Sequence, residues 1–363
     1  MTVFGTRPEA IKMAPLVLAL QKYSEQIETI VTVTAQHRDM LDQVLTLFKI
    51  TPDYDLNIMK EKQTLIDVTT TGLAKLDQVL KHVQPDLVLV HGDTTTTFVA
   101  SLAAFYNQIP IGHVEAGLRT YNKQSPYPEE INRQLTGILA DLHFAPTRTA
   151  AKNLCKEGKL THVTITGNTV IDALKFTVES SYGHPILEKI GDERFILLTA
   201  HRRENLGKPL EQIFLAIKEI LKQHQDLHVV YPVHPNPAVK ALAQKMLHDH
   251  PRIHLMSPLD VNDFHNILSR AHLILTDSGG IQEEAPSFDV PVLVLRDTTE
   301  RPEGVEAGVL KLVGTNTETI ILEVDQLLRN EIAYQEMAQP SNPYGDGHAS
   351  KRIVESILKY FRE

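Results

Sequence analysis

The 363-residue chain contains a single cysteine, Cys155, and this scarcity excludes several kinds of protein. One cysteine can form neither an internal disulfide nor a thiolate metal cluster, which favours a reducing compartment. The surrounding sequence, NLCKEG, gives the thiol no setting that is typical of a nucleophile. Cys155 is therefore interpreted as a structural or surface thiol.

Long apolar runs and basic blocks are also absent. No apolar run reaches the ~18 residues that span a bilayer, and no charged segment followed by an apolar stretch marks a signal peptide. We therefore expect a cytoplasmic protein without a membrane partner. The net charge is −9 with no Lys/Arg block, so no nucleic-acid partner is expected. A small anionic ligand remains compatible, because a few cations and helix N-termini can hold one.

The composition is that of an ordinary globular protein, with 42% hydrophobic and 22% charged residues, and the length predicts about two domains. Short β-branched runs recur along both halves. In the first half they are 2–4, 29–34, 87–91, 109–114, 142–146 and 163–166, and in the second half 195–200, 228–233, 252–256, 272–277, 291–295 and 309–313.

Most of these runs are continuously apolar, which is typical of strands covered on both faces of a parallel sheet. The stretches between them, such as 10–23 and 64–82, have the pattern of amphipathic helices. This alternation predicts two α/β domains of the doubly wound type, with a boundary near 167–174. Two such domains in series should form a cleft at the carboxyl ends of their strands, where ligands of open parallel sheets bind.

Acidic residues follow two predicted strands of the first half. Asp93 comes one glycine after 87–91, and the four threonines 94–97 that follow can cap the next helix. Asp93 could equally be an acid that the helix dipole favours. Glu115 comes directly after 109–114.

The segment SPYPEEINR adds Glu129 and Glu130 in the first turn of a helix started by Pro128. Acids at this place also stabilise a helix without any catalytic role, here with Arg133 one turn away. Because the segments open toward one sheet edge, we expect Asp93, Glu115 and one of the two glutamates to gather. Crowded carboxylates raise one another's pKa, as acid–base catalysis requires.

Candidate phosphate ligands lie at other strand ends. FGTRPEAIKMAPL supplies Gly5, Arg7 and Lys12, without the spacing of a dinucleotide fingerprint or a Walker loop. LTDSGGIQEEAP, after 272–277, opens a helix at Ser278, Gly279 and Gly280, whose bare N–H groups suit a diphosphate; a carboxylate one turn later suits a ribose diol. A plain glycine-rich turn is the alternative.

His201 follows the first strand of the second half in LLTAHRREN, before Arg202 and Arg203. A single histidine is usually structural, but this one is placed to face the predicted cleft. VLRDTTERPEG then adds Arg296 and Arg301 beyond another strand.

Together, GTRPEAIKMAPL, HGDTTTT, GHVEAGLRT, PEEINR, TAHRREN, DSGGIQEEAP, RDTTERPEG and NPYGDGHAS resemble the non-hydrolysing UDP-N-acetylglucosamine 2-epimerase family. The resemblance implies a glycosyltransferase-B-type fold of two Rossmann-like domains, 1–170 and 171–349, with the active site between them and a C-terminal helix, 350–363, that packs back on the first. It also implies a homodimer. The implied activity interconverts UDP-N-acetylglucosamine and UDP-N-acetylmannosamine without metal or other cofactor.

The mechanism that the resemblance implies removes the C2 proton and expels UDP, giving 2-acetamidoglucal, to which UDP adds back. By residue matching, the catalytic groups are Asp93, Glu115, Glu129 and His201; the first three act as acids and bases, and His201 stabilises the diphosphate or shuttles a proton. Arg7, Ser278, Gly279 and Gly280 match diphosphate contacts, Glu284 a ribose contact, Leu259 and Phe264 the uracil wall, and Lys12 and Arg301 other substrate contacts.

The family's bacterial members often bind a second UDP-N-acetylglucosamine as an activator. The matching positions are Gln36, Asp39, Lys62, Glu129, Arg202 and His234. Some relatives have Gln where Asp39 stands and Arg where Lys62 stands, and these exchanges could weaken activator binding.

Three other functions stay open at this point. A glycosyltransferase of the same fold would need an acceptor groove but no acids around C2. A UDP-sugar sensor should have lost Asp93, Glu115 or His201, all of which are present. A hydrolysing epimerase would admit water to the glucal and release UDP.

Overall fold

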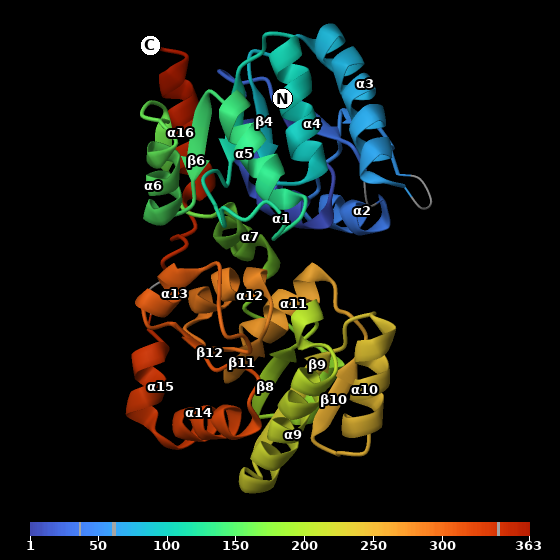
Figure 1. Cartoon of the computed structure of the whole chain (residues 1–363), viewed down its shortest axis with the longest axis vertical. Coiled ribbons are helices and arrows are strands. Elements are labelled where there is room, and N and C mark those ends of the chain that lie inside the picture. Colours follow the sequence, from blue (N-terminus) through green and yellow to red (C-terminus); the bar gives the residue numbers. More distant parts are fainter. Residues whose placement is uncertain (36–37, 60–62, 340–341) are drawn as a thin grey trace. The chain divides into compact units, whose positions relative to one another are not determined.

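The computed structural model describes residues 1–35, 38–59, 63–339 and 342–363. The chain forms two compact units: Met1–Phe176 together with Tyr344–Glu363, and Thr177–Pro343 (Figure 1). In the described part of the chain, no helix is both long and apolar enough to cross a membrane.

The first unit alternates strands and helices. Its elements are β1 (Thr2–Phe4), α1 (Arg7–Gln21), β2 (Val31–Val33), α2 (Arg38–Leu47), β3 (Tyr54–Asp55), α3 (Leu65–Val83), β4 (Val88–His91), α4 (Thr95–Tyr106), β5 (Ile111–Val114), α5 (Glu129–Leu139), β6 (Leu142–Ala145), α6 (Arg148–Lys156), β7 (Val163–Ile165), α7 (Thr169–Thr177) and α16 (Ala349–Tyr360).

The sheet of the first unit has the order β3-β2-β1-β4-β5-β6-β7, and its paired strands are parallel. From β1 the chain adds β2 and β3 on one side of the sheet, and from β4 onward it adds strands on the other side, so the strand order reverses between β1 and β4. Loops diverge at such a switch point, and ligands of doubly wound sheets bind beside it. β1, β4, β5 and β6 are buried along their whole length, which explains their continuous apolar sequence.

Helix α16 belongs to the first unit although the whole second unit, Thr177–Pro343, precedes it in the sequence. Its buried side chains include Ile353, Val354 and Ile357, and it packs against α1. Its own N-cap residue, His348, makes no capping bond with its side chain. The carboxylate of Asp172 in α7 accepts bonds from the N–H groups of Ala349 (3.0 Å) and Ser350 (2.8 Å) instead.

Replacing Asp172 by Ala is therefore expected to lower the free energy of unfolding by about 1–2 kcal/mol, as loss of a helix cap does. Urea denaturation followed by circular dichroism would measure it. Asp249→Ala is the matched control, because the Asp249 side chain is fully exposed. Equal stability of the two variants would show that α16 does not depend on this cap.

The second unit repeats the pattern. Its elements are α8 (Pro185–Ile190), β8 (Arg194–Thr199), the 3₁₀ turn η1 (Arg203–Asn205), α9 (Lys208–Gln223), β9 (Leu227–Pro232), α10 (Pro237–Leu247), β10 (Ile253–Met256), α11 (Val261–Leu268), β11 (Leu273–Thr276), α12 (Gly279–Glu284), η2 (Ala285–Phe288), β12 (Val292–Val294), α13 (Pro302–Glu306), β13 (Leu310–Leu312), α14 (Thr317–Arg329) and α15 (Glu331–Met337).

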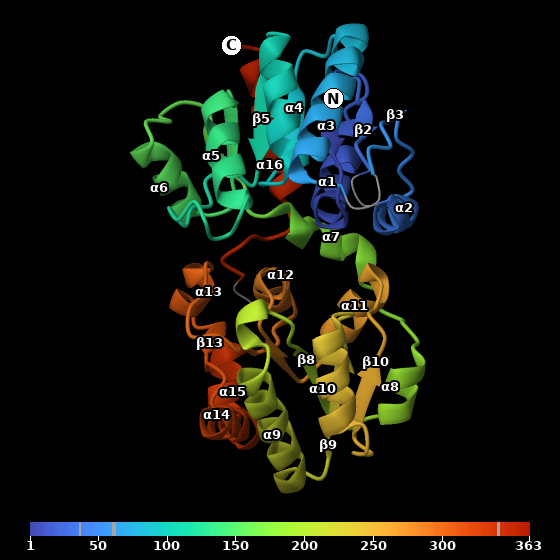
Figure 2. The same cartoon turned by 45° about the vertical axis from the view of Figure 1, so that its right-hand side comes forward.

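The second sheet has the order β10-β9-β8-β11-β12-β13, so its switch point lies between β8 and β11. Successive residues of β8 enter two different cores. Ile196 and Leu198 join the apolar side chains of α9, α10 and α14, whereas Phe195 and Leu197 join those of α8, α11 and α12. Both faces are covered, and the prediction of two doubly wound α/β domains is confirmed (Figure 2).

Every strand predicted from the sequence is present, usually shortened by one or two residues at its ends. The short strand β3 was not predicted, because two residues give no apolar pattern. Cys155 is exposed on α6, as expected for a surface thiol.

Candidate active site

A buried carboxylate joins the two loops at the switch point of the first sheet. Glu9 of α1 is 2% exposed. Its Oε2 accepts bonds from the N–H groups of Gly5 (3.1 Å) and Thr6 (2.8 Å), after β1. Its Oε1 accepts bonds from the hydroxyls of Thr94 (2.7 Å) and Thr97 (3.2 Å), after β4. Glu9 therefore fixes the loop that carries Asp93.

Gly5 is required here for a different reason from the predicted approach of a ligand. A Cβ at Gly5 would lie 1.9 Å from Oγ1 of Thr34, so the neighbouring strand end already occupies the space. The four-threonine run begins α4 as predicted: Thr94 is the N-cap and accepts a bond from the N–H of Thr97.

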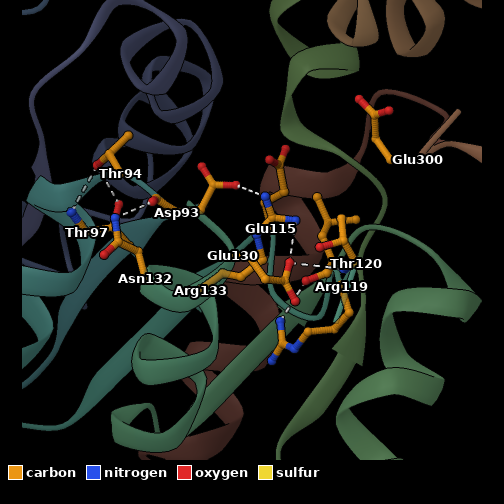
Figure 3. Close-up of polar contacts among 12 residues, drawn as sticks. Asp93, Thr94, Thr97, Glu115, Arg119, Thr120, Glu130, Asn132, Arg133 and Glu300 are labelled. Carbon is orange, nitrogen blue, oxygen red and sulfur yellow. Dashed lines mark hydrogen bonds and ion pairs between the residues drawn. The ribbon is translucent and has the colours of Figure 1, made fainter. Parts of the chain in front are cut away.

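Asp93 lies beside α5. Its Oδ2 is 2.7 Å from Nη2 of Arg133, and its main-chain oxygen accepts a 3.0 Å bond from Nδ2 of Asn132 (Figure 3). The side chain keeps 27% of its surface exposed. Asp93 is thus held by α5 but still accessible to a reactant.

Glu115 lies directly after β5, in a left-handed backbone conformation (φ 62°) that is rare for residues other than glycine. Its Oε2 forms an ion pair with Lys12 of α1 and accepts a 2.8 Å bond from Nδ2 of Asn168. Nε2 of His91 lies 3.6 Å from the same oxygen. The carboxylate is therefore paired with Lys12 of α1, bonded by Asn168 after β7, and close to the ring of His91 in β4.

The environments of the two carboxylates move their pKa values in opposite directions. Burial raises the pKa of Asp93; Arg133 opposes this rise, and the charges of Glu115 and Glu129 add to it. Burial alone would also raise the pKa of Glu115, but Lys12 and then His91 hold it well below its ordinary value. Such a split is how neighbouring carboxylates take different acid–base roles.

The structure separates the two glutamates at the start of α5. Glu130 is fully buried, and its carboxylate accepts bonds from the N–H groups of Thr120 (3.0 Å) and Tyr121 (2.9 Å) (Figure 3). Hydrogen bonding of this kind lowers the pKa of Glu130, against the effect of its burial. Glu130 thus anchors a loop. Glu129 is half-buried, and its charge helps to raise the pKa of Asp93.

A buried histidine supports the loop before Asp93. His113 in β5 is fully buried, and burial lowers its pKa to about 3, so the ring is neutral. Its Nε2 lies 2.7 Å from the carbonyl oxygen of Gly92 and donates to it. His113 is a structural histidine, as most single histidines are.

In the second unit, His201 lies after β8, next to the switch point. Its Nδ1 is 3.2 Å from Oδ1 of the buried Asp277, and its ring stacks on that of His234 with centroids 4.8 Å apart. Nε of Arg202 donates to the main-chain oxygen of Asp277 over 3.3 Å. Strand ends β8 and β11 are thus linked through Asp277, as β1 and β4 are linked through Glu9.

Helix α12 begins at Gly279, as predicted. A Cβ at Gly279 would lie 2.6 Å from Nη1 of Arg301, so the guanidinium packs directly against this glycine. Arg301 also donates to Oε1 of Glu283 (2.8 Å) and to Oε1 of Glu300 (2.7 Å). The predicted Ser278, Gly279, Gly280 and Arg301 therefore lie in one cluster of backbone N–H groups and a cation.

Glu284 of α12 lies near a buried histidine of α11. Its Oε2 is 3.5 Å from Nε2 of His265, whose Nδ1 is 2.7 Å from the hydroxyl of Thr177. Leu259 and Phe264, the predicted uracil wall, are half-buried against the apolar core formed with α8, α11 and α12. The second unit thus brings together Leu259, Phe264 and Glu284 around α11 and α12.

Some predicted positions are not brought into either cluster. Gln36 and Lys62 lie outside the described residues, and the side chain of Asp39 is not described. Arg203 is exposed in η1. Arg7 is the first residue of α1 and half-buried, beside the loop that Glu9 anchors.

Sequence reasoning missed Glu9, Asn168, Asp277 and His265 as site residues. A signal existed for Glu9, since Thr6 and Glu9 have the spacing of a capping box, and both of its bonds form. Asn168 follows β7 as Asp93 follows β4, so the strand-end rule covers it as well. Nothing local distinguishes His265 from other helical histidines. In the described residues, no group of three or more His, Cys, Asp or Glu side chains is arranged to hold a metal ion.

Comparisons with known proteins show which family the chain belongs to. The family model described as UDP-N-acetylglucosamine 2-epimerase matches residues 19–358. The UDP-N-acetylglucosamine 2-epimerase of Bacillus subtilis is 63% identical over 362 residues, which cover 99% of this chain and 95% of that protein.

Solved structures of related proteins also match this chain over nearly its whole length. The S. aureus MnaA protein in a structure with UDP has a TM-score of 0.92 and 57% identity, covering 100% of this chain and 96% of that one. The Neisseria meningitidis UDP-GlcNAc 2-epimerase, bound to UDP-GlcNAc, has a TM-score of 0.89 and 53% identity over 99% of both chains. The chain belongs to the UDP-N-acetylglucosamine 2-epimerase family.

Proposed function

We propose that the protein interconverts UDP-N-acetylglucosamine and UDP-N-acetylmannosamine without net hydrolysis, as an isomerase. A carboxylate takes the C2 proton, the C1–O bond breaks with its electron pair on the β-phosphate of UDP, and a C1–C2 double bond forms. The 2-acetamidoglucal then takes a proton at C2 from the opposite face, and UDP returns to C1. The reaction would take place in the cytoplasm. Its product would supply N-acetylmannosamine for cell-surface polysaccharide.

The opposite pKa shifts of Asp93 and Glu115, which follow the neighbouring strands β4 and β5, carry this proposal. Epimerisation needs a proton acceptor on one face of C2 and a donor on the other, and the raised pKa suits Asp93 to hold a proton at neutral pH better than an ordinary aspartate. Glu115 stays ionised beside Lys12. Glu129 adds a third carboxylate near Asp93, so either Glu115 or Glu129 would serve the second face.

The second unit supports the role of holding UDP while it is detached. Ser278, Gly279, Gly280 and Arg301 would bind the diphosphate, Glu284 the ribose, and Leu259 with Phe264 the uracil. Arg7 and Lys12 of the first unit would make further substrate contacts. UDP and UDP-GlcNAc in the related structures are the ligands this assignment requires.

Proton NMR of the purified protein with UDP-N-acetylglucosamine in D₂O would test the proposal. We expect deuterium at C2 together with UDP-N-acetylmannosamine. Free N-acetylmannosamine plus UDP would indicate a hydrolysing epimerase. An unchanged substrate with a folded, UDP-binding protein would favour a glycosyltransferase or a sensor, and addition of sugar acceptors would then separate these two.

A homodimer is proposed on the apolar surface of the first unit. Helices α3, α4 and α5 lie side by side (Figures 1 and 2) and expose Ile66 (71%), Phe105 (56%), Tyr106 (66%) and Ile138 (66%). Large apolar side chains exposed on neighbouring helices can form a protein interface. Sedimentation velocity should give a dimer that Ile138→Glu weakens, and a wild-type monomer at micromolar concentration would refute this.

We also propose activation by a second UDP-N-acetylglucosamine. Among the positions matched to this second site, Gln36 and Lys62 lie outside the described residues, and the Asp39 side chain is not described. The observation in its favour is that His234 stacks on His201, so a ligand at His234 and Arg202 would touch a catalytic ring. Adding traces of UDP-N-acetylglucosamine to a reaction begun with UDP-N-acetylmannosamine should then shorten an initial lag.

A further inference from the structure

Asp277 has no role in the reaction proposed above. It is nevertheless a fully buried carboxylate directly beside His201. Its Oδ2 accepts three bonds, from the N–H groups of His201 (2.8 Å) and Arg202 (2.8 Å) and from Nδ2 of Asn205 (3.0 Å). This oxygen anchors the loop after β8. Three donors leave it no capacity for the imidazole of His201.

The other oxygen, Oδ1, faces the imidazole. Nδ1 of His201 lies 3.2 Å away, and in the described part of the chain Oδ1 has no hydrogen-bonding partner apart from this contact. Burial would raise the pKa of Asp277, but His201 and the N–H of Arg202 hold it below its ordinary value, so it is ionised. An ionised carboxylate only accepts hydrogen bonds, and Nδ1 must therefore carry a hydrogen.

The surroundings leave Nε2 as the nitrogen that can change its protonation. The ring of His234 is nearly parallel to that of His201, at 13°, which fixes the ring plane. Burial, and then the charge of His201, lower the pKa of His234, so this neighbour is uncharged at neutral pH. Arg202, next to His201, pairs with Glu300 over 3.6 Å, and Glu300 also pairs with Arg296 (2.8 Å) and Arg301 (2.7 Å).

We propose that Asp277 is a positioning residue: it keeps Nδ1 of His201 protonated, so that Nε2 exchanges a proton with the leaving and returning diphosphate of the nucleotide sugar. The inference rests on the proposed function. As the C1–O bond breaks, the Nε2 proton passes to the β-phosphate oxygen that receives the electron pair. It returns to Nε2 when that oxygen attacks C1. Nδ1 of His201 keeps its own hydrogen throughout, directed at Oδ1 of Asp277.

The tautomer of the wild-type protein tests this without any substitution. The protein would be labelled with ¹⁵N-histidine and studied at a pH above which the histidine ¹⁵N signals no longer change, with His201→Gln used to assign the signals. We expect a protonated Nδ1 and a bare Nε2, and we expect added UDP to move the Nε2 signal while Nδ1 stays protonated. A neutral ring protonated on Nε2 would overturn the proposal.

Asp277→Asn reverses the arrangement with little change in shape. The three donors at Oδ2 select the amide oxygen for that side, which turns the NH₂ group toward Nδ1 of His201. Nδ1 then accepts, and neutral Nε2 is fixed in its protonated form. We expect the tautomer to reverse and kcat to fall by about 10²-fold or more, while KM changes little.

Asn205→Ala is the matched control, since it removes a donor to Oδ2 but leaves Oδ1 facing His201. It should reduce thermal stability without reversing the tautomer. If Asp277→Asn reverses the tautomer but leaves kcat unchanged, the proposal is wrong. If wild-type protein has the expected tautomer but shows no C2 exchange with UDP-N-acetylglucosamine, the proposed function fails instead, so the two failures are distinguishable.

Discussion

Asp93→Asn is expected to lower kcat for C2 exchange by about 10³-fold, within the range found when a general acid–base group is removed. The raised pKa of Asp93 is the reason, because an amide cannot bind a proton. The variant should still fold. Its amide oxygen can accept the bond from Arg133, and Asn132 holds the main-chain oxygen, which the substitution does not alter.

Two further measurements make this result specific. Asp86→Asn is the matched control, because Asp86 is an exposed acid near the other end of β4. UDP affinity, measured by calorimetry, should be nearly the same in wild type, Asp93→Asn and Asp86→Asn. Wild-type exchange by Asp93→Asn would show that the catalytic base lies elsewhere, with Glu115 and Glu129 as the next residues to test.

Glu9→Ala is expected to lower the free energy of unfolding by about 3–5 kcal/mol. The substitution leaves the buried N–H groups of Gly5 and Thr6 without an acceptor and removes the acceptor for the hydroxyls of Thr94 and Thr97. Backbone donors cannot be turned away, and each one left unpaired costs about 1–3 kcal/mol. Urea unfolding would measure the loss.

Glu9→Gln separates the two kinds of donor. The Gln oxygen would face the backbone N–H groups, and its NH₂ group would face the threonine hydroxyls, which can rotate and accept. We therefore expect a loss of only about 1 kcal/mol. Glu25→Ala, at an exposed glutamate just after α1, should be neutral. Equal losses for Glu9→Ala and Glu9→Gln would mean that the network is held by charge rather than by acceptor geometry.

Much of the site could be predicted because it lies at strand ends. Asp93, Glu115, His201 and Ser278 each follow a buried apolar run, and the end of such a run is visible in the sequence. Within each unit, the parallel sheet brings its own strand ends to one edge whatever their register. The fold class followed from the same alternation of apolar runs and amphipathic helices.

Partners from distant segments could not be predicted. Lys12 and Asn168 both reach Glu115, but they come from α1 and from the segment after β7, and only the packed sheet shows that they converge. The choice between Glu129 and Glu130 also depends on packing. Both occupy the first turn of α5, and the loop at Thr120 and Tyr121 determines which one is buried.

The placement of α16 has a consequence for biosynthesis. The unit that carries Asp93 and Glu115 includes Tyr344–Glu363, which the ribosome makes only after all of Thr177–Pro343. Domains generally fold as they emerge, so the second unit can fold while the first still lacks the helix that packs on α1 and that Asp172 caps. We expect the unit proposed for acid–base chemistry to mature after the unit proposed to bind UDP, and a chain stalled before Tyr344 to lack a completed first unit.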